Sequence, residues 1–196
     1  MKKIIVSALV AALSFVAANA QSVRENWHEI DKVTVYSQFH ANECQTLYVV
    51  PVDESAIVYG DDLSKGQRKK IDKNREQFRD AIKKQLAKPF PRLDVKIVSE
   101  MPASLGAGEA ALQVKYTEFD TGSAALRAFT YGADHCAFAV VADVIGEGGS
   151  TLVEFQHRQV KTGNPFGAYY PNELHKSFQD DIAELLTTMM MELNKE

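Results

Sequence analysis

Asp134, His135 and Cys136 are the one local cluster whose side-chain types could perform nucleophilic chemistry. A cysteine nucleophile needs a thiolate, which a neighbouring base such as histidine can generate. Adjacent residues of a strand point to opposite faces, so His135 does not face Cys136 if this segment is extended. Spacing alone therefore argues against a Cys-His catalytic pair here.

His157 could complete a pocket with Asp134 and His135, although only tertiary folding could bring the three side chains together. His157 with Glu154 or His135 could likewise hold a metal only after such folding. We therefore predict a non-enzyme with no catalytic residues, no metal ligands and no cofactor. The alternative is an exported small-ligand-binding or hydrolytic domain with a pocket near Asp134, His135 and His157.

The sharpest charge feature is the segment 65–88, which holds ten Lys or Arg and three acids, a local charge of about +7. A cationic segment of this kind can be a solvated face. It can also dock on an anionic surface such as lipid headgroups, lipopolysaccharide or an acidic protein patch. The residues that would carry this binding are Lys65, Arg68, Lys69, Lys73, Arg79, Lys83 and Lys84.

Residues 1–20 have the pattern of a secretory signal peptide: a Lys-Lys start, an apolar run and an Ala-x-Ala exit. The apolar run is too short to span a bilayer, so we expect cleavage after Ala20 and no transmembrane segment in the mature chain. Gln21 stands where a bacterial lipoprotein would have cysteine. The prediction is a soluble periplasmic or secreted protein, for which a nucleic-acid partner is not expected.

Cys44 and Cys136 are the two cysteines of the chain. An oxidising compartment and an even count favour a disulfide between them. Such a bond would close a loop of about 90 residues and stabilise the fold by roughly 4 kcal/mol in the chain-entropy model. Two separate buried thiols are the alternative.

The hydrophobic pattern predicts an α+β fold with one mixed sheet of about five strands. Strands are expected at 44–52, 93–99, 110–119, 136–145 and 151–160, and amphipathic helices from Ser64 to about Lys88 and from Pro171 onward. This order predicts a βαβ unit followed by an antiparallel meander, with a hairpin turn at 146–149 and both helices packed on one face. The domain plan is a signal peptide at 1–20, a polar N-terminal segment at 21–44 with at most one short strand, and a single domain at 45–196.

The stretch with Gly122, Arg127, Gly132-Ala133 and Asp143, followed by a Gly turn and the returning strand at 152–155, resembles a family of exported bacterial domains of unknown function. That family is often lipidated. It is similar to the amino-terminal domain of the Tol-system translocation protein and to auxiliary lipoproteins of transporters. The resemblance covers about residues 45–192 and departs at 134–135, where the family has a turn glycine. It implies a cell-envelope role through protein contact.

These observations predict a non-enzymatic, exported cell-envelope domain that binds a protein or an anionic envelope component. Self-association is a further prediction, because the rest of the mature chain carries about −13 and complements the basic segment.

Overall fold

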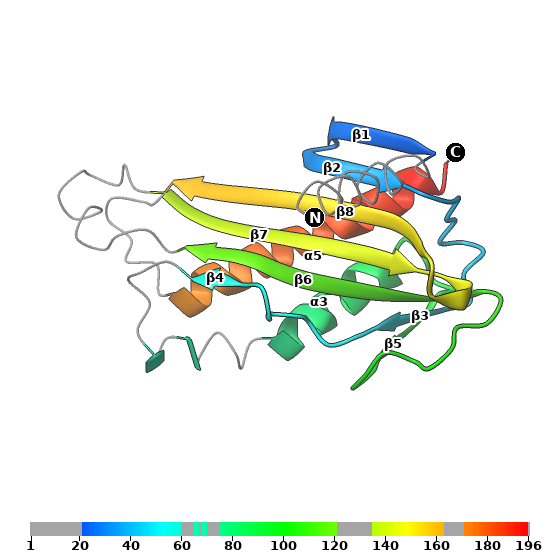
Figure 1. The fold of residues 1–196 in the computed structure, drawn as a ribbon, viewed down its shortest axis with the longest axis horizontal. Helices are drawn as coiled ribbons and strands as arrows, with labels where there is room; N and C mark the ends of the chain where they lie inside the picture. Colours follow the sequence, from blue (N-terminus) through cyan, green and yellow to red (C-terminus); the bar gives the residue numbers. More distant parts are fainter. Residues whose placement is uncertain are drawn as a thin grey trace, which may run out of the picture.

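A computed structural model describes residues 21–59, 65–66, 68–69, 75–120, 135–162 and 171–195. Within these residues, eight strands form one mixed sheet in the order β1-β2-β8-β7-β6-β3-β5, with β4 paired to β6 off this path. Two long helices, α3 (Arg75–Ala87) and α5 (Pro171–Leu193), lie on one side of the sheet (Figure 1). The predicted α+β class and mixed sheet are confirmed.

The centre of the sheet is the antiparallel hairpin of β7 (His135–Ile145) and β8 (Thr151–Thr162). The turn between them contains Gly148 at φ 71° and Gly149 at φ 79°, which residues with a side chain rarely adopt. On its other side β7 pairs with β6 (Glu109–Asp120), also antiparallel. The predicted meander and its glycine turn are therefore confirmed.

The βαβ unit consists of β3 (Thr46–Val49), α3 and β5 (Asp94–Ile97). Strand β3 pairs in parallel with β5, as the helical crossover predicted, and it also pairs in parallel with β6. Residues 65, 66, 68 and 69 are helical as well, ahead of α3. The predicted start of the helix at Ser64 lies outside the described residues.

The prediction of about five strands was wrong, because the described residues also contain β1 (Ser22–Trp27), β2 (Ile30–Val35) and β4 (Val58–Tyr59). Strand β1 has no buried residue and so lacks the apolar alternation that reveals a strand. Its turn to β2 contains no glycine, and β4 has only two residues. Much of the segment 21–44 is consequently part of the main sheet.

The core lies between the sheet and the two helices. Helix α3 buries Phe78, Ile82 and Leu86, which recur every four residues on one face, as expected of the predicted amphipathic helix. Helix α5 and the central strands supply many of the other large buried side chains: Leu112, Tyr116, Phe119, Phe138, Phe155, Phe178, Ile182, Leu186, Met189 and Met190.

No disulfide joins Cys44 and Cys136, so that prediction was wrong. Cys44 lies beside the first residue of β6, whereas Cys136 lies beyond the last, where Asp120 pairs with Ala137. The length of β6 separates them by about 36 Å at roughly 3.3 Å per residue. Because a disulfide requires Cα atoms within about 7 Å, both remain buried thiols.

A helix with the length and hydropathy of a membrane span does not occur in the described part of the chain. The predicted signal peptide at 1–20 lies outside the described residues. Export therefore stays a prediction.

Candidate functional site

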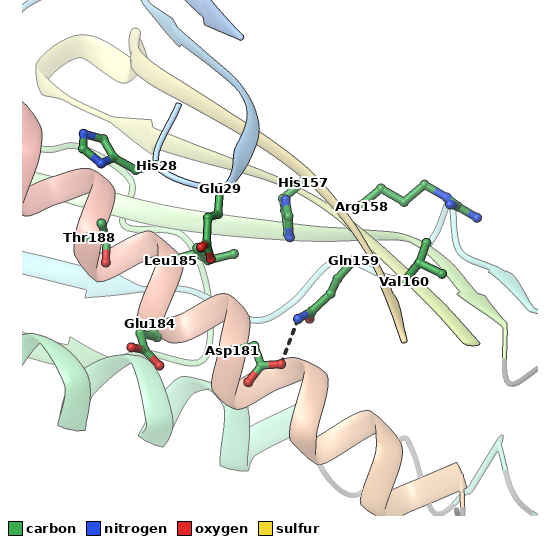
Figure 2. Close-up of a pocket in the computed structure, with 10 residues that line it drawn as sticks. All are labelled: His28, Glu29, His157, Arg158, Gln159, Val160, Asp181, Glu184, Leu185 and Thr188. Carbon is green, nitrogen blue, oxygen red and sulfur yellow. Dashed lines mark hydrogen bonds between the residues drawn. The ribbon is translucent and has the colours of Figure 1, made fainter. Parts of the chain in front are cut away.

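A groove of about 700 Å³ opens where β8 continues past the first residues of β2 and lies over helix α5 (Figure 2). Three elements form its walls: the turn between β1 and β2, the second half of β8, and the middle of α5. The lining residues are His28, Glu29, His157, Arg158, Gln159, Val160, Asp181, Glu184, Leu185 and Thr188.

Strand β8 supplies the floor of the groove and fastens it to α5. Gln159 Nε2 donates a hydrogen bond of 2.9 Å to Asp181 Oδ2, and Lys161 Nζ lies 2.6 Å from the same carboxylate. Because strand residues alternate between faces, Arg158 points the other way, as Figure 2 shows. There its guanidinium holds both oxygens of Glu118, at 2.7 and 2.8 Å.

His157 lies at the junction of β8 with β2. Its Nδ1 is 3.6 Å from Asp31 Oδ2, which also accepts a hydrogen bond of 2.6 Å from the backbone N–H of Arg158. Burial lowers the pKa of His157 below the ordinary value of 6.5, while the carboxylates of Asp31 and Glu29 offset part of that shift. The imidazole is therefore neutral at neutral pH.

The turn that overhangs the groove is strained. Trp27 pairs with Ile30, and the two residues between them, His28 and Glu29, have φ of 50° and 67°. A two-residue hairpin turn with positive φ at both positions normally uses Asn-Gly, because a side chain there costs energy. The sequence instead places His28 and Glu29 at this turn, where both line the groove.

The groove carries negative charge. Of its three carboxylates, Asp181 is matched by Lys161, whereas Glu29 and Glu184 are exposed and make no ion pair within the described residues. The one lining guanidinium is matched by Glu118 on the other face. Such a site favours a cationic ligand.

Neither serine nor cysteine is among the described lining residues. Across the described ranges, no three His, Cys, Asp or Glu side chains are grouped as a metal site. Asp134 of the predicted alternative pocket lies outside the described residues. His135 pairs with Thr162 and His157 with Val140, so about 16 Å of strand separates the backbone positions of the two histidines.

The predicted anion-binding residues are not equivalent. Lys65, Arg68, Lys69, Lys83 and Lys84 are exposed, and the Arg68 guanidinium lies 5.0 Å from the ring centre of Tyr59. Arg79 is buried: it donates a hydrogen bond of 2.6 Å to the Val98 carbonyl and pairs with Glu76. The Arg79 guanidinium therefore stabilises the fold and is not available to an anionic surface. Lys73 lies outside the described residues.

Sequence reasoning missed Glu29, Asp181 and Glu184. The one available signal was the acidic surplus outside the basic segment, part of which falls on α5 as Asp180, Asp181 and Glu184. No sequence pattern connects these acids to a turn about 150 residues earlier.

Comparison with known proteins leaves the family open. No protein-family model and no curated protein matches the sequence. Among solved structures, the chain is similar to the PelC dodecamer from Paraburkholderia phytofirmans (12% identity, TM-score 0.43, covering 79% of this chain and 96% of that one). An uncharacterised protein gives 14% identity and a TM-score of 0.43, covering 79% of this chain and 96% of the other.

A neuraminyllactose-binding hemagglutinin homolog from Helicobacter pylori gives 8% identity and a TM-score of 0.37, covering 80% of this chain and 86% of that one. These likenesses are too distant to carry the ligands or assembly of those proteins over to this chain. The resemblance to Tol-type and lipoprotein domains stays a prediction. Of its residues, Gly122, Arg127 and Gly132-Ala133 lie outside the described residues, and Asp143 is buried beside Lys115 at 3.1 Å.

Proposed function

We propose that this protein is a non-enzymatic, exported domain that binds a basic segment of a partner protein in the groove between the β1–β2 turn, β8 and α5. The observation that carries the proposal is the pair of exposed carboxylates, Glu29 and Glu184, on opposite walls of that groove. A lysine or arginine entering between them would be attracted by both carboxylates. Partner lysines or arginines would therefore act as the anchors.

The composition of the groove supports binding more than chemistry. Its imidazole at His157 is held neutral by burial, and its other polar groups, Gln159 and Asp181, bond to each other across the floor. Leu185 supplies apolar surface beside the charges. A charged rim around a partly apolar floor is the usual composition of a protein-recognition site.

The strained turn supports the same proposal. Holding His28 and Glu29 at positive φ costs stability, and residues in such conformations cluster at ligand-binding sites. An Asn-Gly turn would close the hairpin without this cost. Retention of Glu29 is explained if its carboxylate binds a ligand.

A photo-crosslinking amino acid at Thr188 tests the proposal in the native host. Thr188 lines the groove, and Met191, three residues along the same helix and 40% exposed, is the matched control outside it. We expect one partner to be captured from position 188 and not from 191. Its capture should fall when Glu29→Gln and Glu184→Gln are introduced together; equal capture from both positions, unaffected by these changes, would refute the proposal.

A second candidate function is docking to an anionic envelope surface through the exposed cations Lys65, Arg68, Lys69, Lys83 and Lys84. The observation that favours it is the exposure of Lys83 and Lys84 on the outer side of α3, where no ion pair within the described residues engages them. Vesicle binding distinguishes this function, because it requires α3 and not the groove. Self-association between the basic and acidic surfaces of two copies belongs to the same class.

A further inference from the structure

The edge of β8 beside the groove is not covered by a strand in the described part of the chain. Strand β2 begins at Ile30, and the last β2–β8 pair joins Lys32 to Gln156. Strand β8 continues to Thr162, paired on its other side with β7 throughout. From Arg158 onward, β8 therefore presents one edge outward.

Two hydrogen bonds establish which backbone groups face that edge. The Leu152 carbonyl accepts from the Tyr36 N–H at 2.8 Å, and the Arg158 N–H donates to Asp31 Oδ2 at 2.6 Å. Backbone direction alternates along a strand, so the even-numbered residues of β8 face the β2 side. The N–H and C=O of Val160 consequently point out of the sheet.

An outward-facing N–H of this edge already binds an acceptor, the side-chain carboxylate of Asp31. This carboxylate takes the position beside the Arg158 N–H that the Ile30 carbonyl would occupy if the β2–β8 pairing continued in register. The next outward residue, Val160, has a side chain that is 45% exposed, which is unusual for valine in a central hairpin. Both features fit an edge that receives another strand.

We propose that the basic segment binds by adding to β8 as an antiparallel strand centred on Val160. An antiparallel pair uses both the N–H and the C=O of one residue, which is what Val160 offers. The partner residue opposite Val160 packs on its exposed side chain. The residues on either side of it point toward α5 and reach Glu29 and Glu184, so the segment alternates apolar and basic residues.

This inference rests on the proposed function and adds the mode of binding. A second copy of the chain is a poorer occupant than a basic partner. Pairing two β8 edges would bring two sets of Glu29 and Glu184 together, and like charges at short range oppose association.

The test uses a fluorescent peptide of alternating lysine and valine, measured by anisotropy against the full mature protein. N-methylation of its valine amides removes the hydrogen bonds toward β8, whereas N-methylation of its lysine amides, which point away, is the matched control. We expect the first to weaken binding about tenfold or more and the second to leave it nearly unchanged. Equal affinity of both methylated peptides and the parent would overturn strand addition while leaving charge-based binding intact.

On the protein, Val160→Pro removes the outward N–H without removing a hydrogen bond to β7, because this N–H points away from β7. It should weaken the parent peptide about tenfold, whereas Val160→Ala should have a smaller effect; equal affinities for both variants would contradict the proposed register. If no lysine peptide binds, the proposed function itself fails. If the protein alone is a dimer by light scattering and Val160→Pro makes it a monomer, the edge pairs with a second copy and the partner-strand proposal is overturned.

Discussion

Asp31 Oδ2 lies 3.6 Å from Nδ1 of His157, across the junction at which β2 ends and β8 continues. The same oxygen accepts the backbone N–H of Arg158, so one carboxylate serves both the imidazole and the strand edge. Glu29 approaches His157 from the turn, and Asp181 and Glu184 line the groove from α5. The His157 imidazole is thus a titratable group that shares the groove with carboxylates from the β1–β2 turn and from α5.

Stability should fall as the pH is lowered through the titration range of His157. Burial holds the pKa of His157 in the folded protein below 6.5, so the unfolded chain takes up the proton first as the pH decreases. The contribution of neutral His157 is therefore complete above about pH 6.5 and is lost progressively toward the lower folded pKa. Urea unfolding from about pH 7.5 to about pH 5 measures this loss.

The control for this titration is His157→Gln, which should flatten the stability profile in the same window. Asp31→Asn removes a charge that favours the protonated imidazole, so NMR titration should show the pKa of His157 lowered further. A parental slope that persists in His157→Gln would assign the pH dependence to other groups.

Glu29→Gly should stabilise the fold and weaken binding at once. Glycine adopts the φ of 67° without steric cost, and relief of this strain should raise the free energy of unfolding by about 1 kcal/mol. The carboxylate is lost, so affinity for a lysine-rich peptide should fall. Glu29→Gln is the matched variant, because it loses the charge and keeps the strain: it should bind weakly without gaining stability.

The central hairpin could be predicted because its information is local. Gly148 and Gly149 permit the positive φ of the turn, and Val153 and Phe155 alternate with polar neighbours on β8. Strands β1 and β2 could not be predicted in this way, because β1 buries no side chain and its turn has His28 and Glu29 where glycine is usual. Their position in the sheet depends on pairing with a strand more than 100 residues later.

The groove could not be predicted because it arises from a difference in strand length. His157 was recognised as a candidate, but its neighbours Asp31 and Glu184 come from distant segments that only the sheet and α5 bring close. Charge predicted a cationic surface on α3, yet charge alone could not distinguish exposed Lys83 from buried Arg79. The position of each residue around the helix decides that difference.

Both cysteines should be thiols in the purified protein. Alkylation in denaturant without reductant should modify Cys44 and Cys136 completely, as measured by intact mass. Burial raises the pKa of the Cys44 thiol, so its reaction in the folded protein should be slow. Reductant should leave Tm unchanged, whereas a fraction that reacts only after reduction would contradict the strand register.

Arg79→Gln should destabilise the protein by about 2 kcal/mol, the cost of losing charge-assisted hydrogen bonds and leaving a partly buried acceptor unpaired. Its guanidinium connects α3 to the Val98 carbonyl just after β5. Denaturant unfolding measures the loss. Arg79→Lys keeps the charge but not the planar geometry and should recover only part of the stability; full recovery would show that charge alone matters here.

Lys83→Glu with Lys84→Glu should reduce retention on vesicles containing phosphatidylglycerol if α3 docks on an anionic surface. Each exposed lysine near such a surface contributes about 1 kcal/mol, so two reversals should weaken retention tenfold or more. The matched control is Lys195→Glu, an exposed lysine at the far end of α5, which should have little effect. Retention that is equal for the parent and the double variant, measured by co-sedimentation at low salt, would remove α3 as a membrane-docking surface and leave the groove as the remaining candidate site.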